Sequence, residues 1–421
     1  MTRQTDGVWG SVVKNVWLIA AALAIVAWSP FAQAQEASGV GGVRVGNGRL
    51  HPYVRSGSTY ITNPALLPQA NTYDMVLNVT PGIDLDLPSN SSDLRLSAGG
   101  SYKKYLGVDD PNTERLTAFE PSAGFAAHLF KEGGVGARLN GSYRLVSTAA
   151  SRLEIQRLRH HLLQGGVGLD FKPGGGALVL SPNYAVRYDR YIEGVDTREL
   201  THVRHEPSLR FSWKFFPKTS AFIESRAMLT RYPEATINRG TDFYGGLIGL
   251  YGQVTRRVST KAQVGYNYVN SQGKKPMPVM GDLAVGYGYH ATRLEVGVGR
   301  NFYPTSVYQH YSNLRTYLRF LQSIAQVKLD TKIAYGRYEF GDPLTTGLED
   351  SRLDQRVSFN FRIIYPVTPW ILLSVADNLE VLRTNAGTSI QVVTGTGETI
   401  TDTLAGNYTT NSVSLLLELR Y

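Results

Sequence analysis

The sequence contains no cysteine, so disulfide bonds and thiolate metal sites cannot contribute to its stability. Beyond its N-terminal segment it also lacks any apolar run of the ~20 residues that a transmembrane helix needs. Acidic residues are scarcer than basic ones, 34 against 43, which gives a formal net charge of +9. These shortages exclude a disulfide-stapled secreted domain and a helical membrane protein, and they leave a basic chain of modest hydropathy.

Tyrosine and glycine are abundant, with 25 and 43 residues, and long segments alternate between apolar and polar positions. In the segment 208–215, for example, Leu209, Phe211 and Trp213 alternate with Arg210 and Ser212. Alternation of period two predicts β-strands with one apolar and one wet face. Tyrosine suits the interfacial girdles of a membrane barrel, and glycine suits its turns.

The N-terminus has the features of a secretory signal peptide. Arg3 and Lys14 precede or flank an apolar run over residues 16–28, and the small residues Ala32 and Ala34 form a cleavage site. We therefore predict a signal peptide at 1–34, a short periplasmic tail at 35–48 and a single barrel at 49–421. Removing the signal peptide takes away Arg3, Lys14 and Asp6, so the net charge falls from +9 to +8.

From residue 49 onward, strand candidates are joined alternately by short turns and longer polar loops. The pattern contains about eight turns and nine loops, which predicts about eighteen antiparallel strands in an up-and-down transmembrane β-barrel, an all-β fold. The expected turns lie at 88–92, 131–134, 172–176, 217–220, 256–259, 290–293, 322–325 and 366–369. The expected loops lie at 63–70, 107–114, 149–156, 193–200, 233–240, 271–280, 304–309, 341–354 and 384–406.

The chain ends in an alternating strand that stops on an aromatic residue. Leu417, Leu419 and Tyr421 would face lipid, while Glu418 and Arg420 would face inward. A terminal aromatic strand of this kind is read by the outer-membrane barrel assembly machinery in proteins that this chain resembles. Together with the signal peptide and the unequal loops, it places the expected barrel in the lipid of a Gram-negative outer membrane, with turns and termini on the periplasmic side.

The wet faces of the predicted strands carry more basic than acidic residues. Such a lumen would concentrate anions, unless the basic residues are neutralised in cross-strand ion pairs, an alternative that the sequence leaves open. The predicted pore-lining residues are Arg95, Arg138, Arg144, Arg187, Arg210, Lys214, Arg226, Arg315, Arg319, Lys328, Lys332, Arg356 and Arg362.

A barrel of this size is too wide for wall side chains alone to fill. We expect a constriction from the basic loop 151–161, with Arg152, Arg157 and Arg159, or from the Thr/Gly-rich loop 384–406. Either loop could instead lie outside the lumen.

The first hairpin carries a resemblance to known proteins. In residues 73–85 the pair Pro81-Gly82 interrupts an alternating strand, as in the second strand of a family of β-barrel porins of Gram-negative bacteria, which this segment resembles. Beyond this hairpin the architecture is similar to the barrels that export alginate and other exopolysaccharides. The resemblance implies a periplasmic or outer-membrane polysaccharide export protein as a partner.

Three functions remain open at this point. We expect a conduit that translocates a polysaccharide, an anionic polymer, past the Arg/Lys-lined lumen. The alternatives are a general or anion-selective diffusion porin for small solutes, and a structural or adhesive barrel with a blocked lumen. No cofactor, metal or nucleic acid is expected. The paired His160 and His161 would point to opposite faces of a strand, and no catalytic triad spacing is present, so we expect no enzymatic activity.

Overall fold

The structure is a computed structural model of the whole chain. It describes residues 41–64, 72–109, 114, 116–148, 158–193, 197–235, 240–270, 279–303, 310–341, 352–385, 390–393, 399–402 and 407–421. The predicted signal peptide and most of the predicted tail lie outside this part of the chain, so both stay predictions.

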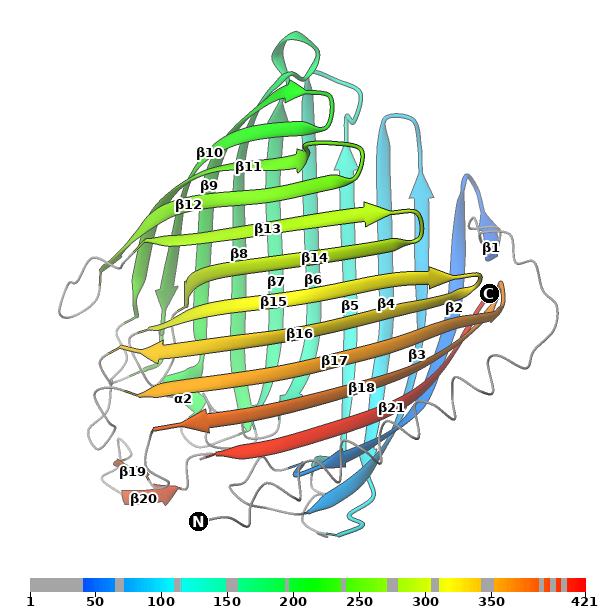
Figure 1. Cartoon of the computed structure of the whole chain (residues 1–421), viewed down its shortest axis with the longest axis vertical. Coiled ribbons are helices and arrows are strands. Elements are labelled where there is room, and N and C mark those ends of the chain that lie inside the picture. The colour runs from blue at the N-terminus through cyan, green and yellow to red at the C-terminus, as the bar shows by residue number, and fades with distance from the viewer. Residues whose placement is uncertain are drawn as a thin grey trace. The chain divides into compact units, whose positions relative to one another are not determined.

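Residues 41–421 form one compact unit, an antiparallel sheet closed into a barrel (Figure 1). The first half of the ring contains β2 (Gly48–Thr62), β3 (Tyr73–Pro88), β4 (Ser92–Tyr105), β5 (Ala118–Leu129), β6 (Val135–Thr148), β7 (Leu158–Phe171), β8 (Leu178–Glu193), β9 (His202–Phe216) and β10 (Thr219–Arg231). The second half contains β11 (Asp242–Gln253), β12 (Val258–Asn270), β13 (Met280–Tyr289), β14 (Thr292–Tyr303), β15 (Tyr311–Ile324), β16 (Val327–Phe340), β17 (Leu353–Thr368), β18 (Ile371–Thr384) and β21 (Tyr408–Arg420).

The ring closes where the two ends of the chain meet. Strand β21 pairs with β18 on one side and with β2 on the other, so Tyr53 faces Arg420 and Ile61 faces Ser412. The sheet has 19 strands, and the short β1 (Val43–Val45) pairs with β2, which leaves 18 strands in the closed ring. The prediction of about eighteen antiparallel strands is confirmed, and β1 lies within the predicted tail at 35–48.

Short connections lie at one end of the barrel and long ones at the other (Figure 1). We call these the turn end and the loop end. The turn end also holds the start of β2 and the end of β21, as expected for a barrel whose termini are periplasmic. At the loop end, β19 (Ile390–Val393) and β20 (Thr399–Asp402) form a separate hairpin, and α2 (Thr197–Leu200) is a single helical turn. No helix in the described part of the chain is long and apolar enough to cross a membrane.

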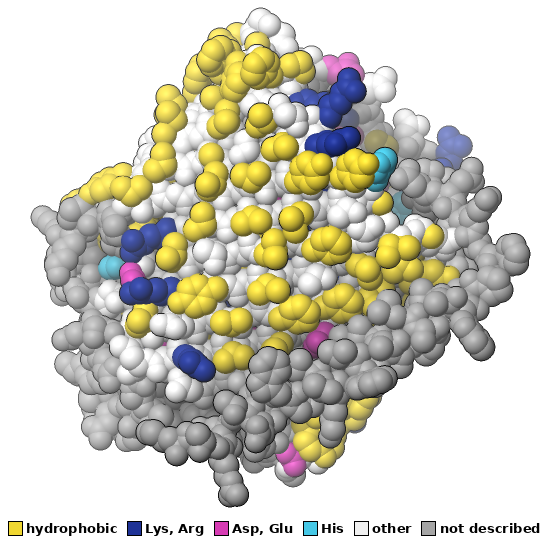
Figure 2. Space-filling view, in the orientation of Figure 1, with side chains coloured by type: hydrophobic (Ala, Val, Ile, Leu, Met, Phe, Trp, Pro, Cys, Tyr) yellow, Lys and Arg dark blue, Asp and Glu magenta, His cyan; other side chains and the backbone are white. Residues whose placement is uncertain are grey.

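The outer face of the barrel is apolar (Figure 2). On β9 the side chains of Leu209, Phe211 and Trp213 are about half exposed, at 48%, 44% and 52%, whereas Arg210 points to the other face and binds Glu224 of β10. An apolar outer face of a closed barrel is typical of contact with lipid, because in water such a surface would aggregate. The predicted alternation therefore describes a lipid-facing outside and a wet inside.

The Pro81-Gly82 pair lies in the middle of β3, as the resemblance implied. Its pairing with β4 is interrupted, because Val79 pairs with Tyr102 and the next pair joins Gly82 to Gly99. The ring of Tyr53 covers Gly82 so closely that a Cβ there would lie 2.4 Å from it. Only glycine fits under this ring, so the tyrosine of β2 fills the space that the irregular strand leaves.

Candidate functional site

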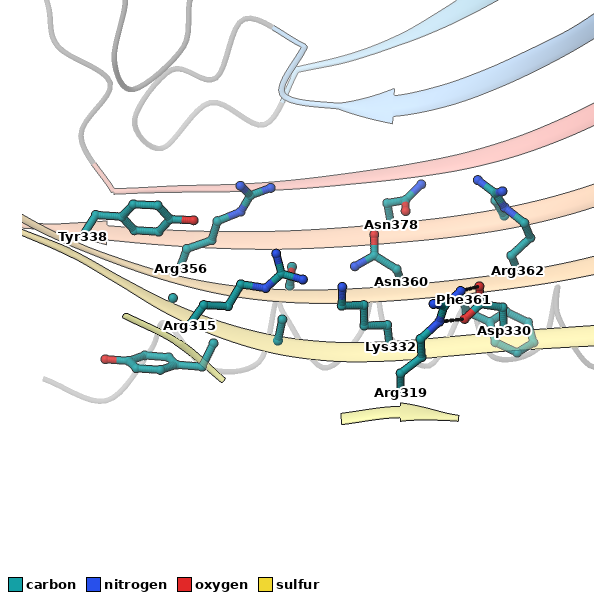
Figure 3. A pocket seen from close by; sticks show the side chains of 15 residues that line it. Arg315, Arg319, Asp330, Lys332, Tyr338, Arg356, Asn360, Phe361, Arg362 and Asn378 are labelled. Atoms are coloured by element: carbon teal, nitrogen blue, oxygen red, sulfur yellow. Dashed lines mark hydrogen bonds and ion pairs between the residues drawn. The ribbon is translucent and has the colours of Figure 1, made fainter. Parts of the chain in front are cut away.

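The candidate site lies on the inner face of β15 to β18 (Figure 3). We call it the basic wall and define it by five side chains that line one cavity of about 410 Å³. These five are Arg315, Arg319, Lys332, Arg356 and Arg362.

The strand register brings these residues together in three rows. In the first, Arg315 pairs with Gly336, which pairs with Arg356. Gly336 has no side chain, and the ring of Tyr338 occupies the space over it, where a Cβ would lie 2.9 Å from the ring. The row therefore joins positions that are 41 residues apart in the sequence.

The second and third rows lie toward the turn end. The second runs from Arg319 through Lys332 and Asn360 to Asn378, so two cations adjoin two amides. The third pairs Asp330 with Arg362 across β16 and β17. Residues of one row share a face because side chains alternate with period two in every strand.

The basic wall carries more positive than negative charge. Arg319 forms a two-point ion pair with Asp330, with N···O distances of 2.9 and 2.7 Å, and Arg356 binds Glu380. Among the described residues, Arg315, Lys332 and Arg362 have no carboxylate partner within ion-pair distance. Five cations and two carboxylates leave a local charge of +3, and the low-dielectric wall focuses its field into the lumen.

Aromatic residues support the long side chains of the wall. Tyr317 of β15 lies between Arg315 and Lys332, with its ring 5.4 Å from the guanidinium carbon of Arg315 and 4.8 Å from Nζ of Lys332. Its hydroxyl donates a hydrogen bond of 2.8 Å to Glu295 of β14. These cation–π contacts orient the two cations without neutralising them.

The other predicted lining residues occupy different surroundings. Several form ion pairs across neighbouring strands: Arg95 with Asp86, Arg138 with Asp170, Arg187 with Asp189, and Arg210 with Glu224. Arg226 donates to the sulfur of Met280 at 3.1 Å. Arg144 lies on β6, Lys214 on β9 near the turn end, and Lys328 at the start of β16. Cross-strand ion pairs therefore form at some of the predicted positions, whereas the lining of an open pore by these residues stays a prediction.

The predicted constriction loops fall mostly outside the described residues. This holds for Arg152 and Arg157, and for much of the loop 384–406. Arg159 lies in β7, where it pairs with Ser147 and Glu193 in the register of the sheet. A narrowing of the lumen by either loop stays a prediction.

A second cluster, which sequence reasoning missed, surrounds Asp189 at the loop end of β8. Arg187 donates to both oxygens of this carboxylate at 2.5 and 2.8 Å. Nε2 of His160 and Nε2 of His202 each lie 3.4 Å from one of its oxygens. His161, the neighbour of His160, contacts Tyr143 on the opposite face, as the alternation predicted. No group of metal-binding side chains was found within the described part of the chain.

Comparison with known proteins gives a likeness of fold. No family model matches the sequence, and no curated protein matches it. The structure of Pseudomonas aeruginosa OccK2 in complex with glucuronate is similar at a TM-score of 0.50 and 10% identity, over 89% of this chain and 98% of that one.

Two further solved structures are similar at slightly lower scores. Pseudomonas aeruginosa OpdK with vanillate has a TM-score of 0.49 and 10% identity, over 88% of this chain and 98% of that one. Acinetobacter baumannii OccAB3 has a TM-score of 0.48 and 10% identity, over 90% and 100%. The chain thus has the all-β fold of the OccK2 structure, and its own sheet is a closed antiparallel barrel of 18 strands.

Proposed function

We propose that this protein is an outer-membrane channel for small anionic solutes, and that the basic wall is the site that attracts them. The observation that carries the proposal is the excess of three positive charges on one wall of the lumen, where Arg315, Lys332 and Arg362 have no carboxylate partner among the described residues. Guanidinium groups and amides together suit a carboxylate that also carries hydroxyl groups, since both can donate hydrogen bonds to it.

This proposal follows the alternative of a diffusion porin rather than polysaccharide export. OccK2 holds a small carboxylate, glucuronate, and it shares the fold of this chain. That likeness supports a small solute better than a polymer, while export past the same charges stays a prediction without further support. A barrel with a blocked lumen would differ from both, because it would not conduct ions.

The test is ion selectivity of the purified full-length protein in a planar bilayer under a KCl gradient. We expect the wild-type channel to prefer chloride over potassium. We also expect added glucuronate to reduce its current. Arg315→Gln with Arg362→Gln should weaken both effects, since neither change strands a bound carboxylate. Arg190→Gln is the matched control, because Arg190 pairs in register with His161 on the outer face.

Two results would contradict the proposal. A protein that inserts without conducting would support the blocked barrel. Unchanged selectivity in the double variant would mean that the basic wall does not govern permeation.

A further inference from the structure

A row of arginines crosses the outer face of the barrel near the loop end. The register joins Arg300 of β14 to Leu314, Leu314 to Arg337 of β16, Arg337 to Gln355, and Gln355 to Arg383 of β18. Two observations place the row on the outer face. Leu314 is exposed, and the residues one position along the same strands, such as Arg315 and Arg356, line the cavity in the lumen. Figure 2 shows basic side chains beside the apolar surface, over the loop ends of these strands.

The row marks a sharp boundary between apolar and charged surface. One step toward the turn end, the outer face carries Val298, Tyr335 and Val357, all of which are exposed. Two residues along a strand span about 7 Å, so the change from hydrocarbon-facing to charged side chains occurs within one step. Such a boundary lies where lipid chains meet lipid headgroups.

Glu339 holds two of these arginines close together. Its carboxylate lies 3.0 Å from Arg300 and 2.9 Å from Arg337, and it also accepts a hydrogen bond of 3.2 Å from Ser312. The three arginines and this one carboxylate leave a local charge of +2. Each guanidinium has five N–H donors, so donors remain available after the contact with Glu339.

An apolar groove of about 620 Å³ leads along the outer face to Arg300. Its floor contains small residues of β10, β12 and β13, namely Ala221, Ala262 and Gly281. Its sides contain larger ones, including Ile248 and Leu283. A groove with an apolar floor and a cation at one end matches an acyl chain that is attached to an anionic headgroup.

We propose that this surface binds a phosphorylated, multiply acylated glycolipid of the outer leaflet, a ligand of the lipid A class. An acyl chain lies in the groove, and a headgroup phosphate receives hydrogen bonds from Arg300 and Arg337, with Arg383 extending the positive surface. Arginine suits this role because its planar group binds phosphate through two donors at once. The proposal concerns the outer face of the barrel and does not depend on which solute the lumen carries.

The experiment measures binding of diphosphorylated, hexa-acylated lipid A to the full-length protein in detergent, by native mass spectrometry. The same lipid without phosphates serves as the second probe. We expect wild type to prefer the phosphorylated lipid, and Arg300→Gln with Arg337→Gln to bind it about thirtyfold more weakly, from the loss of two cations at a lipid surface. The double variant should bind the two probes with equal affinity.

Two further variants separate the parts of the site. Ala262→Leu fills the groove with an apolar side chain that is stable in lipid. It should weaken the binding of both probes, while the preference for the phosphorylated lipid remains. Arg190→Gln removes an outer-face arginine of β8 and should bind as wild type does. Chloride selectivity in a bilayer, which should be unchanged in all variants, shows that each barrel is folded and keeps this test separate from that of the channel.

Three outcomes would overturn the proposal. The first is equal binding of the two probes by wild type. The second is wild-type affinity for the phosphorylated lipid in the Arg300 and Arg337 double variant. The third is a loss of affinity in Arg190→Gln that equals the loss in the double variant. Wild-type binding by Ala262→Leu would remove the groove from the site.

Discussion

At the scale of single residues, the surroundings of a charge decide what it does. Asp189 is fully buried, and its carboxylate is compensated by Arg187, with two histidines at 3.4 Å. Asp86, in contrast, is 41% exposed and faces Arg95, which is 77% exposed. Water screens both partners of the second pair, whereas in the first pair it reaches Arg187 but not the carboxylate of Asp189.

We therefore expect the two aspartates to respond differently to neutralisation. Asp189→Asn removes the fully buried carboxylate that Arg187, itself 36% exposed, binds through two hydrogen bonds, and should lower the free energy of unfolding by about 3 kcal/mol. Asp86→Asn, the control, should change it by less than about 1 kcal/mol. Urea unfolding in lipid vesicles, followed by tryptophan fluorescence, measures both. Equal values for the two variants would show that burial does not set the strength of these pairs.

At the scale of elements, β21 has the most demanding position, since it joins the last strand of the chain to the first. Arg55 of β2 binds Glu418 of β21 at 3.0 Å, and Thr59 shares a hydrogen bond of 2.9 Å with Ser414. On its outer face Leu417 and Leu419 are exposed to lipid, and Tyr421 follows the strand at 65% exposure. At this end of the barrel wall, the inner side chains of β21 therefore hold the closing pair of strands together, and its outer side chains are exposed.

This ending leads to a prediction about assembly. Tyr421→Ser should lower the amount of barrel in the outer membrane several-fold, because we expect Leu417, Leu419 and Tyr421 to be read by the assembly machinery. Refolding of the purified variant in detergent should be unaffected, since the hydrogen bond that Tyr421 forms with a described residue runs from its backbone nitrogen to the carbonyl oxygen of Pro52, which the variant keeps. Trp370→Ser is the matched control, an exposed aromatic in the turn beside β21. Quantitative blotting of membrane fractions would refute the prediction if both variants reached wild-type levels.

At the scale of the whole molecule, the fixed charges of the lumen act together as a field. The lumen side of β15 to β18 has its +3 excess, while Asp282 and Glu295 lie on the adjoining β13 and β14 and line a cavity together with Arg315 and Lys332. An anion that enters the barrel thus meets an asymmetric potential, positive on one wall.

Such a field should depend on salt. The Debye length is about 10 Å at 0.1 M ionic strength and about 3 Å at 1 M, so added salt screens charges across an open lumen. We expect the chloride preference of the wild-type channel to fall as KCl is raised between these values. Reversal potentials at a constant concentration ratio measure this. A preference that stays constant would mean that ions contact the basic wall directly rather than sense its field.

The fold could be predicted closely because its signals are local. Alternation in segments such as 208–215 reports the strand and its two faces, and turns such as 290–293 recur between strands. Each hairpin sets its own register, so Arg210 and Glu224, which are 14 residues apart, could be paired from the sequence. The pair of Arg55 with Glu418 spans 363 residues and exists only because the ring closes.

The sequence by itself determined a closed barrel of about eighteen strands, with an apolar outside and a polar inside, because a period of two fixes the face of every side chain. Only the tertiary structure decided which cations stay free and which are neutralised, since that depends on side chains from three or more strands at one height of the barrel. It also showed that Arg300 and Arg337, whose place in the alternation is lipid-facing, lie together at the loop end, where charge can meet headgroups. Alternation fixes the face of a residue, but the height at which strands align follows from the register of the closed sheet.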